Sequence, residues 1–495
     1  MSTLKKILLA LLVFLLLVGL FLWWALRGPE AELTIDETSG TDPILAEPNP
    51  ENIPTLGVVE VANWADGEAP QPDEGLVVNR FADGLEHPRI VYAMPNGDIL
   101  VTLTNRPESE LSGGAITNFV AGLLFERAGA AAPSPDQLVL LRDGDGDGAA
   151  DERHVLRDDL MSPSGIAWRD GNLYIANHNA LLRFDYEEGA KRLEGEPEKL
   201  LDLPSAGNHW MRNILFGADG TKLYVAVGSA SNIGEGGMAQ EEGRAAIHEL
   251  DLESGASRIY GAGMRNPNGL AINPWTGELW TTVNERDQLG PDLVPDYMTN
   301  VPIGVHYGWP WVYYNDVFDD RVEDRMPQFL TEYTRTPEYA LGAHVAALGL
   351  VFTQEGARMG EGLGQGAFVA RHGSWNRRPP SGYDVVYVAF DERGNPQGKP
   401  IPVLTGFLQG DIAKGRPTWL AWDATGALLV SDDVGNIIWR VTAPGAKGAA
   451  APVRNRGKSL PPQRNLDGDP SRAFDDPPES MMEMMSGSQR GAAQP

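Results

Sequence analysis

The sequence of 495 residues contains no cysteine. Disulfides, thiolate metal sites, cysteine nucleophiles and a CxxCH haem-attachment motif are therefore excluded. Basic residues are scarce, with 40 Lys and Arg against 68 Asp and Glu, and the formal net charge is -28. A chain this acidic lacks the basic surface that binds phosphates, which excludes nucleic acid as a partner. Long amphipathic helical patterns are also missing, so the secondary-structure signal comes mainly from short strand patterns.

One long hydrophobic run is present, at the N-terminus. Residues 7–26 are apolar, and Lys5 and Lys6 precede them. About 20 such residues span a bilayer as a helix. We predict an uncleaved transmembrane anchor over residues 1–27, which makes the protein a single-pass protein of a bacterial inner membrane with the rest of the chain in the periplasm. A cleaved signal peptide is the alternative, although the run ends in WWALRG and not in a small-x-small site.

Two flanking segments lack hydrophobic periodicity. Residues 28–72 are rich in Pro, Glu, Asp and Thr, which predicts a linker and an irregular lead-in. Residues 444–495 contain Ala, Gly, Pro, Arg and Met without a pattern, which predicts a disordered tail. Residues 73–443 lie between these segments and form the predicted globular part.

Six short apolar stretches in this part each follow a tight turn at or near a glycine. They read NGDILVTLT, DGNLYIANH, DGTKLYVAVGS, TGELWTTVN, QGAFVARHG and TGALLVSDD. A second short strand pattern precedes each stretch, which predicts six hairpins. Repeated antiparallel units that bury their faces against their neighbours are typical of propellers. We predict an all-β fold, a six-bladed β-propeller preceded by the transmembrane helix, and the alternative is a β-sandwich or two barrels.

Charged and imidazole side chains recur where the first strand of a hairpin begins. They are His87, Arg89, His209, Arg212, Arg265 with Asn266, His344 and Arg416. In a propeller these positions face the mouth of the central channel, so the side chains would form a basic funnel in an acidic protein. A cluster of like charges is unfavourable unless an anion lies within it. The sequence therefore predicts a site for a small polyanionic ligand.

Several motifs resemble those of the quinoprotein sugar dehydrogenases, the soluble glucose dehydrogenase and L-sorbosone dehydrogenase group. They are GNHWMRNILFGADGTKLYVAVGS, MRNPNGLAINPWTGELW and VHYGWPW, and the sorbosone dehydrogenase-like branch is indicated by HPRIVYAMPNGDILV, LLRDGDGDGAADE, HGSWNR and GRPTWLAW. The resemblance covers roughly residues 72–441. It implies a six-bladed propeller with pyrroloquinoline quinone (PQQ) and calcium as cofactors and a sugar or aldose as substrate. Since the chain has no haem-attachment motif, electrons would pass to a separate acceptor, a quinone or a cytochrome.

The resemblance also implies roles for individual residues. His209 is expected to be the general base, and Arg265 to stabilise charge near the quinone oxygens. The positions expected to bind the cofactor are Asn266, Arg416, Arg89, His372, Trp375 and Asn376. Glucose-oxidising members of the group have Asp before the catalytic His, whereas this chain has Asn208, which leaves the sugar open.

Two loops are candidate calcium sites. The resemblance places the catalytic ion in the loop NERDQLGPDLVPDY, at Glu285, Arg286 and Asp287 with Asp292 nearby. The run DGDGDGAADE places Asp143, Asp145, Asp147 and Asp151 as in the first half of an EF-hand loop, although the twelfth position is His154 instead of Glu. We predict a structural calcium ion in this second loop, and a plain acidic turn is the alternative.

Two other functions remain open at this point. Six-bladed propellers also include calcium-dependent lactonases and related hydrolases, which need carboxylate and amide ligands in the channel. A non-enzymatic ligand-binding propeller would need no imidazole directed into the channel.

Overall fold

The computed structural model describes residues 3–26, 29–51, 57–107, 122, 126–129, 131–205, 207–314 and 316–454. The chain divides into two compact units, Met1–Asn455 and Arg456–Pro495. The second unit, and with it most of the tail predicted over 444–495, lies outside the described residues. The described part of the first unit consists mainly of β-strands.

Six antiparallel sheets follow one another along the chain, and we number them as blades 1 to 6. Blade 1 contains β5 (Pro88–Ala93), β6 (Ile99–Leu103), β7 (Gln137–Arg142) and β8 (Glu152–Arg157). Blade 2 contains β9 (Gly165–Arg169), β10 (Asn172–Ala176), β11 (Ala180–Asp185) and β12 (Glu198–Asp202). Blade 3 contains β13 (Ile214–Phe216), β14 (Lys222–Val227), β15 (Ala246–Asp251) and β16 (Ser257–Ala262). Blade 4 contains β17 (Asn266–Ile272), β18 (Leu279–Asn284), β19 (Pro295–Asn300) and β22 (Tyr339–Ala343). Blade 5 contains β23 (Ala347–Phe352), β24 (Gly366–Arg371), β25 (Asp384–Phe390) and β26 (Pro396–Thr405). Blade 6 contains β29 (Pro417–Trp422), β30 (Leu428–Asp432), β31 (Ile437–Thr442) and β4 (Val77–Ala82).

The predicted hairpins are the first two strands of each blade, and their turns use glycine as expected. Gly97, between β5 and β6, has a φ of 91°, in the left-handed region that favours glycine. The first strands contact one another in the order β5, β9, β13, β17, β23 and β29, and β29 contacts β5. The blades therefore surround one axis, in agreement with the predicted all-β propeller.

Hydrophobic side chains are buried between the blades. Each of the six largest core clusters combines residues of two successive blades. Between blades 4 and 5, for example, the ring of Trp280 packs edge-to-face against Phe352 and Phe390, with centroids 6.0 and 5.3 Å apart. A single four-stranded sheet could not bury both of its faces, which is why the units require one another.

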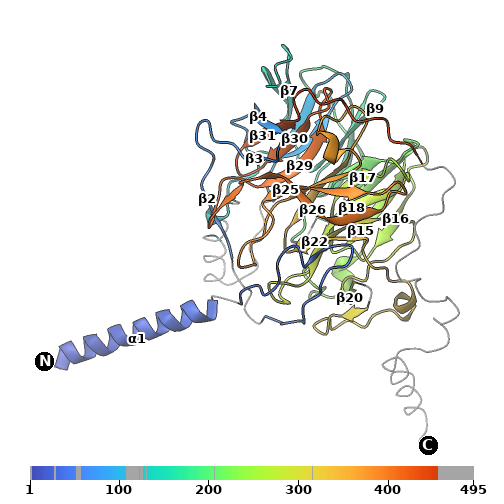
Figure 1. Ribbon diagram of the computed structural model, residues 1–495. Helices are drawn as coiled ribbons and strands as arrows, with labels where there is room; N and C mark the ends of the chain where they lie inside the picture. Colours follow the sequence, from blue (N-terminus) through green and yellow to red (C-terminus); the bar gives the residue numbers. More distant parts are fainter. Residues whose placement is uncertain are drawn as a thin grey trace, which may run out of the picture. The chain divides into compact units, whose positions relative to one another are not determined.

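The ring closes within blade 6, where an N-terminal strand completes a C-terminal sheet. Strand β4 lies beside β31 (Figure 1) and pairs with it antiparallel. The register places Val78 opposite Val441. The first and last parts of the propeller are thus held in one sheet by backbone hydrogen bonds.

The lead-in before the propeller pairs with three of its strands. β1 (Ser39–Gly40) pairs with β22, β2 (Glu60–Val61) with β28 (Ile412–Ala413), and β3 (Gln71–Pro72) with β26. The remaining short elements are β20 (Val312–Tyr313), β21 (Val317–Phe318), β27 (Leu408–Gln409), η1 (Met238–Glu241), η2 (Gln328–Glu332) and η3 (Glu361–Leu363). β20, β21 and η2 belong to an insertion between β19 and β22.

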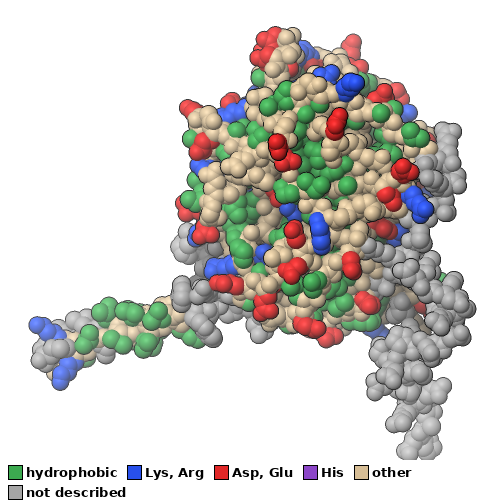
Figure 2. All heavy atoms as spheres, viewed as in Figure 1, with side chains coloured by type: hydrophobic (Ala, Val, Ile, Leu, Met, Phe, Trp, Pro, Cys, Tyr) green, Lys and Arg blue, Asp and Glu red, His purple; other side chains and the backbone are tan. Residues whose placement is uncertain are grey.

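The N-terminal run forms a helix, α1 (Thr3–Leu26), as predicted. Hydrophobic side chains lie exposed along its described part (Figure 2). Spanning about 30 Å of hydrocarbon takes about 20 consecutive apolar residues. Among the residues that the structure describes, however, no helix combines the length and the apolarity needed to cross a membrane. The predictions of a transmembrane anchor over 1–27 and of a single-pass location in an inner membrane are therefore wrong.

Candidate active site

The predicted charged positions meet at one end of the propeller. In each blade the start of the first strand lies opposite the end of the second, as the pairs Asn266–Asn284 and Pro417–Asp432 show. The loops before the first strands and after the second strands therefore share this end, which we call the mouth. The side chains there that we call the funnel residues are Arg89, His209, Arg265, His344, His372 and Arg416.

Side-chain contacts connect the funnel residues around the mouth. Arg89 Nε lies 3.2 Å from the sulfur of Met211, two residues after His209. Arg416 Nε donates to the backbone oxygen of His372 at 3.2 Å. The structure thus brings together residues from blades that are far apart in the sequence.

His209 lies in the loop before β13 and is half-buried. Its Nδ1 lies 2.8 Å from the backbone oxygen of Ser229 and 3.0 Å from the Ser229 hydroxyl. A carbonyl oxygen can only accept, so Nδ1 carries the proton and Nε2 is the unprotonated nitrogen. Burial lowers the pKa of His209 well below its usual value, and the positive charge of Arg265 adds to this effect. The imidazole is therefore neutral near pH 7 and able to accept a proton.

Arg212, three residues after His209, shapes the loop that carries it. The guanidinium is fully buried and donates to the backbone oxygens of Pro204 and His209 at 2.6 and 2.8 Å. Arg212 therefore holds the loop from within and is not a free cation of the mouth.

Arg265 is fixed by four hydrogen bonds. Its Nη1 donates to the backbone oxygen of Glu285 at 2.7 Å, and Nη2 donates to Asp287 Oδ2 at 2.8 Å. Asn232 accepts the other two bonds, through its backbone oxygen at 3.2 Å and its amide oxygen at 2.9 Å. The side chain is only 8% exposed, and its charge is compensated by the Asp287 carboxylate.

A second carboxylate, Asp433, compensates Arg89. Arg89 Nη1 lies 2.7 Å from Asp433 Oδ2, and His372 Nε2 lies 3.0 Å from Oδ1. Burial alone would raise the pKa of Asp433, but His372 and Arg89 together hold it below its usual range. Asp433 is therefore ionised, and Arg89 also stacks over the ring of Trp210 at 5.0 Å.

Arg416 differs from the other two funnel arginines because its hydrogen-bond partners are neutral. Its Nη2 donates to the backbone oxygen of Gly373 at 2.7 Å, and the guanidinium lies 5.1 Å from the ring of Tyr383. In the described part of the chain no carboxylate forms an ion pair with it. The positive charge of Arg416 is thus available to an anion.

The neighbouring amides and the indole complete the site. Asn266 Nδ2 donates to Asn284 Oδ1 at 3.2 Å, while Asn266 Oδ1 is buried and has no protein partner among the described residues. A Cβ added at Gly228 would lie 2.4 Å from that oxygen, so only glycine allows this approach. Asn376 Nδ2 donates to Asp287 Oδ1 at 2.9 Å, and the Trp375 side chain is 40% exposed.

In the loop predicted to hold the catalytic calcium ion, neighbouring side chains bind different parts of the protein. Glu285 is bound to Arg286, whose fully buried guanidinium donates to the backbone oxygens of Pro310 and Val312 in the insertion. Among these three positions, the Asp287 side chain binds the funnel residue Arg265, and Glu285 reaches Arg265 only through its backbone oxygen. Asp292 is likewise used elsewhere, because it binds Arg377 and the backbone nitrogens of the lead-in.

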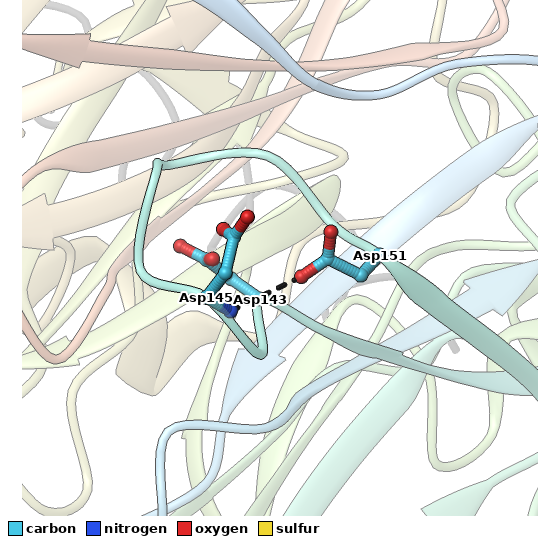
Figure 3. A group of neighbouring side chains, drawn as sticks. All are labelled: Asp143, Asp145 and Asp151. Carbon is cyan, nitrogen blue, oxygen red and sulfur yellow. Dashed lines mark hydrogen bonds between the residues drawn. The ribbon is translucent and has the colours of Figure 1, made fainter.

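The second predicted calcium loop joins β7 to β8. Because β7 starts opposite the end of β6, this loop lies at the end of blade 1 away from the mouth. Ligand atoms of Asp143, Asp145 and Asp151 lie within 4.8 Å of one another (Figure 3). Asp147 is not part of this group, and its Oδ1 accepts from the nitrogen of Ala149 at 2.8 Å. Among the residues that the structure describes, three or more possible metal-ligating side chains come together in this loop and in no other group.

Sequence reasoning missed Asp433, Ser229 and Asn232. The sequence carries a signal for Asp433 and Ser229, since they lie one and two residues after the second strand of a hairpin, in LLVSDD and VAVGS. The ends of the second strands lie at the same mouth as the starts of the first strands.

A family model described as TrAA12-like matches residues 138–301 and 319–443. These ranges contain every funnel residue except Arg89. The chain is 33% identical over 119 residues to the aldose sugar dehydrogenase of Escherichia coli strain K12, which is 21% of this chain and 30% of that protein. It is 26% identical over 301 residues to the PQQ-dependent pyranose dehydrogenase of Coprinopsis cinerea, 48% of this chain and 40% of that protein. Both matches span less than half of the relative's own length.

Solved structures share the fold. A Trichoderma reesei protein of carbohydrate-active enzyme family AA12 superposes with a TM-score of 0.61 at 20% identity, covering 76% of this chain and 98% of that chain. The PQQ domain of the Coprinopsis cinerea pyranose dehydrogenase, in its holo form, gives 0.58 at 21% identity, covering 76% and 97%. At these identities the likeness shows the fold alone. Together with the sequence matches and the family model, these comparisons confirm the resemblance that the motifs predicted.

Proposed function

The chain belongs to the TrAA12-like family, and on this premise we propose that it is an oxidoreductase that uses PQQ to oxidise a sugar or aldose-type hemiacetal. The names of the relatives support this reaction class, because both curated proteins are sugar dehydrogenases and one is PQQ-dependent. The observation that carries the proposal is the combination, in one funnel, of a neutral histidine and an arginine that has no carboxylate partner among the described residues. The electrons would leave to a separate acceptor, a quinone or a cytochrome.

The funnel suits PQQ, which has three carboxylates on a planar ring system. The Arg416 guanidinium is positioned to bind one carboxylate, since its present partners are neutral. The buried Asn266 oxygen has no partner among the described residues, so it is an acceptor that a donor or a water molecule in the same site could use. Arg89, His372, Trp375 and Asn376 would line the cofactor. When bound, PQQ would supply the quinone group that accepts the hydride of the sugar, which carries both electrons of the oxidation.

The protein residues supply the proton transfer and the charge. His209 Nε2 takes the proton of the sugar hydroxyl, because its Nδ1 proton is held by Ser229. Arg265 stabilises the developing negative charge, and its hydrogen bonds to Asp287 and Asn232 keep it in place before the reaction begins.

The two loops predicted to bind calcium differ in how well their side chains suit the ion. Calcium takes six to eight oxygen ligands. The side chains of Glu285 and Arg286 do not fit such a site, because they bind each other and the insertion, and Asp287 is paired with Arg265. No step is therefore assigned to a metal there. We place a structural calcium ion in the β7–β8 loop instead, since like charges as close as Asp143, Asp145 and Asp151 repel one another without a cation.

The hydrolase alternative needs a metal site inside the channel. In the described ranges the group of three or more acidic or imidazole ligands lies in the β7–β8 loop, and at the mouth the carboxylates of Asp287 and Asp433 are each paired with an arginine, which favours the oxidoreductase over a calcium-dependent lactonase. A non-enzymatic propeller would leave the fixed tautomer of His209 without a use.

The proposed function is tested by titrating the purified protein with PQQ and following the quinone absorbance. Saturable binding is expected, and added sugar should then bleach the bound quinone. Absence of saturable binding, with or without calcium, would rule the proposal out.

For Arg265→Lys we expect normal PQQ binding and slower reduction. Lysine keeps the charge, but a single ammonium group cannot reach Glu285, Asp287 and Asn232 together, so the charge is less well placed. The rate of single-turnover reduction should fall by about 10-fold, below the loss for removing such a donor entirely. Arg440→Lys is the control, because Arg440 is paired with Asp423 in blade 6 and does not belong to the funnel. Equal rates for the two variants would contradict the role of Arg265.

The β7–β8 loop gives a separate prediction about calcium. Chelation should lower the melting temperature of the wild type by a few degrees, since a ligand at 100 times its Kd stabilises by about 2.7 kcal/mol. Asp145→Asn should melt at the chelated temperature with or without calcium. Asp147→Asn removes the same charge from the same loop but lies outside the carboxylate group, so it should keep the calcium response. If both variants kept it, the loop would be a plain acidic turn.

A further inference from the structure

A buried carboxylate connects the lead-in to the mouth. Asp432, the last residue of β30, has no exposed surface. Its Oδ1 accepts from the backbone nitrogens of Arg416 and Gly435 at 2.7 and 2.8 Å. Its Oδ2 accepts from the indole nitrogens of Trp64 and Trp439 at 2.8 and 3.2 Å. Four donors thus satisfy one carboxylate, and one of them is the backbone of the proposed cofactor anchor.

The chain around Arg416 is built closely against this carboxylate. A Cβ added at Gly415 would lie 2.0 Å from Asp432 Oδ2, and one added at Gly435 would lie 2.2 Å from the same atom. Both positions therefore require glycine. Because the residue before Arg416 touches the carboxylate directly, a displacement of Asp432 moves the backbone that carries the guanidinium.

Trp64 is the contribution of the lead-in. Its side chain is buried, and its ring packs edge-to-face against Trp439 and Phe407, with centroids 5.3 and 5.7 Å apart. Ala62, two residues before Trp64, continues the contact, because its backbone nitrogen donates to the oxygen of Ala413 at 2.8 Å. The lead-in is thereby bonded both to Asp432 and to the segment three residues before Arg416.

The same segment also borders the guanidinium itself. A small cavity at the mouth is lined by Arg416, Trp375 and Tyr383 on the propeller side and by valines of the lead-in on the other, namely Val58, Val59 and Val61. The lead-in therefore meets Arg416 from two sides, through the backbone by way of Asp432 and through the surroundings of the side chain.

We propose that Trp64 and Asp432 are positioning residues for Arg416, so that the lead-in is part of the cofactor site. This inference rests on the proposed function, because it takes Arg416 as the anchor for a PQQ carboxylate. Arg416 is held at two points. Its guanidinium donates to the backbone oxygens of His372 and Gly373, and its backbone nitrogen donates to Asp432. Loss of the Trp64 hydrogen bond leaves Asp432 less firmly fixed, which loosens the backbone of Arg416 and lowers the affinity for PQQ.

The test is a double-mutant cycle measured by PQQ titration on the full chain. We expect Trp64→Phe to weaken PQQ binding by about 2- to 10-fold, the usual value of one hydrogen bond. Trp422→Phe is the matched control, since this blade 6 indole also donates to one buried partner, the backbone oxygen of Phe352 in blade 5, and no hydrogen bond joins it to Asp432 among the described residues. It should lower the melting temperature and leave PQQ affinity unchanged.

The decisive comparison is Trp64→Phe in an Arg416→Ala background. If Trp64 acts through Arg416, the second substitution adds nothing to the loss. A full additional loss, or Trp64→Phe binding as tightly as the wild type, would overturn the inference. If Trp64→Phe does not fold, Phe407→Leu loosens the packing on Trp64 and should weaken PQQ binding in the same direction, and unchanged affinity would again overturn it. Failure of the wild type to bind PQQ would instead remove the proposed function.

Discussion

Replacement of His209 by alanine is expected to slow sugar-dependent reduction of bound PQQ by about 10²–10⁴-fold, the usual contribution of a positioned acid–base group. PQQ affinity and melting temperature should change little, because among the described residues the His209 imidazole bonds to Ser229 alone and the residue lies in a loop. Single-turnover reduction, measured at saturating PQQ and sugar, gives the rate directly. The comparison is made per molecule of loaded protein, so that any loss of folded material does not enter.

The control for this substitution is His248→Ala. His248 also lies in blade 3, and burial lowers its pKa as well, but it lies on the third strand, its ring is bound to the oxygen of Gly243, and it is not a funnel residue. It should reduce PQQ at the wild-type rate. A His209→Ala protein with near-normal turnover would exclude the proposed base even if PQQ were bound.

The pH dependence of the wild type provides a second measure of the same group. A base with a lowered pKa is neutral above that pKa and is lost only as the pH falls through it. An ordinary histidine, with a pKa of about 6.5, is mostly protonated at pH 5.5. The reduction rate is therefore expected to persist at that pH and to fall at lower values, because burial and Arg265 keep His209 neutral.

For Arg416→Ala the expected effect is on binding and not on the rate. Removal of a charged hydrogen bond typically costs about 1.5–3 kcal/mol, which corresponds to about 10- to 150-fold weaker PQQ binding. Because Arg416 forms no ion pair in the described part of the chain, its removal leaves no carboxylate unpaired, and the fold should keep its stability. Excess PQQ should then restore most of the turnover.

Arg258→Ala separates this effect from a general change in charge. Arg258 lies on the outer strand β16, 57% exposed, and is paired with Glu249. Its removal should leave PQQ affinity unchanged. If the two variants bound PQQ equally well, Arg416 would not be an anchor.

The six hairpins could be read from the sequence because each is local, with a glycine turn between two apolar runs. The charges at the mouth followed from the same pattern, since one position relative to each strand recurs. What compensates those charges could not be read in this way. Asp433 and Arg89 are 344 positions apart and meet only because the ring closes. In the loop that follows β18, Glu285 binds Arg286 whereas Asp287 binds Arg265. This difference depends on the insertion, whose backbone oxygens bind Arg286, and no local sequence pattern indicates that contact.

The N-terminal segments show a second limit. The composition of the hydrophobic run predicts a membrane span, but the described helix lacks the combination of length and apolarity that crossing a membrane needs. The lead-in has no periodicity, yet its strands pair with β22, β26 and β28. A segment that borrows its hydrogen bonds from a completed domain needs no repeating pattern of its own.

The pairing of β4 with β31 has a consequence for biosynthesis. Blade 6 combines residues 77–82 with strands from residues 417–442, so it cannot be complete until nearly all of the propeller has been translated. Until then the growing chain carries two uncovered blade faces and an unpaired strand, features that favour aggregation. Contacts over such distances also form slowly. Since Arg89 and Asp433 lie on either side of that seam, the arginine is compensated only after closure. A nascent chain would therefore complete its anion site last. Binding of the cofactor would then indicate that the ring of blades has closed.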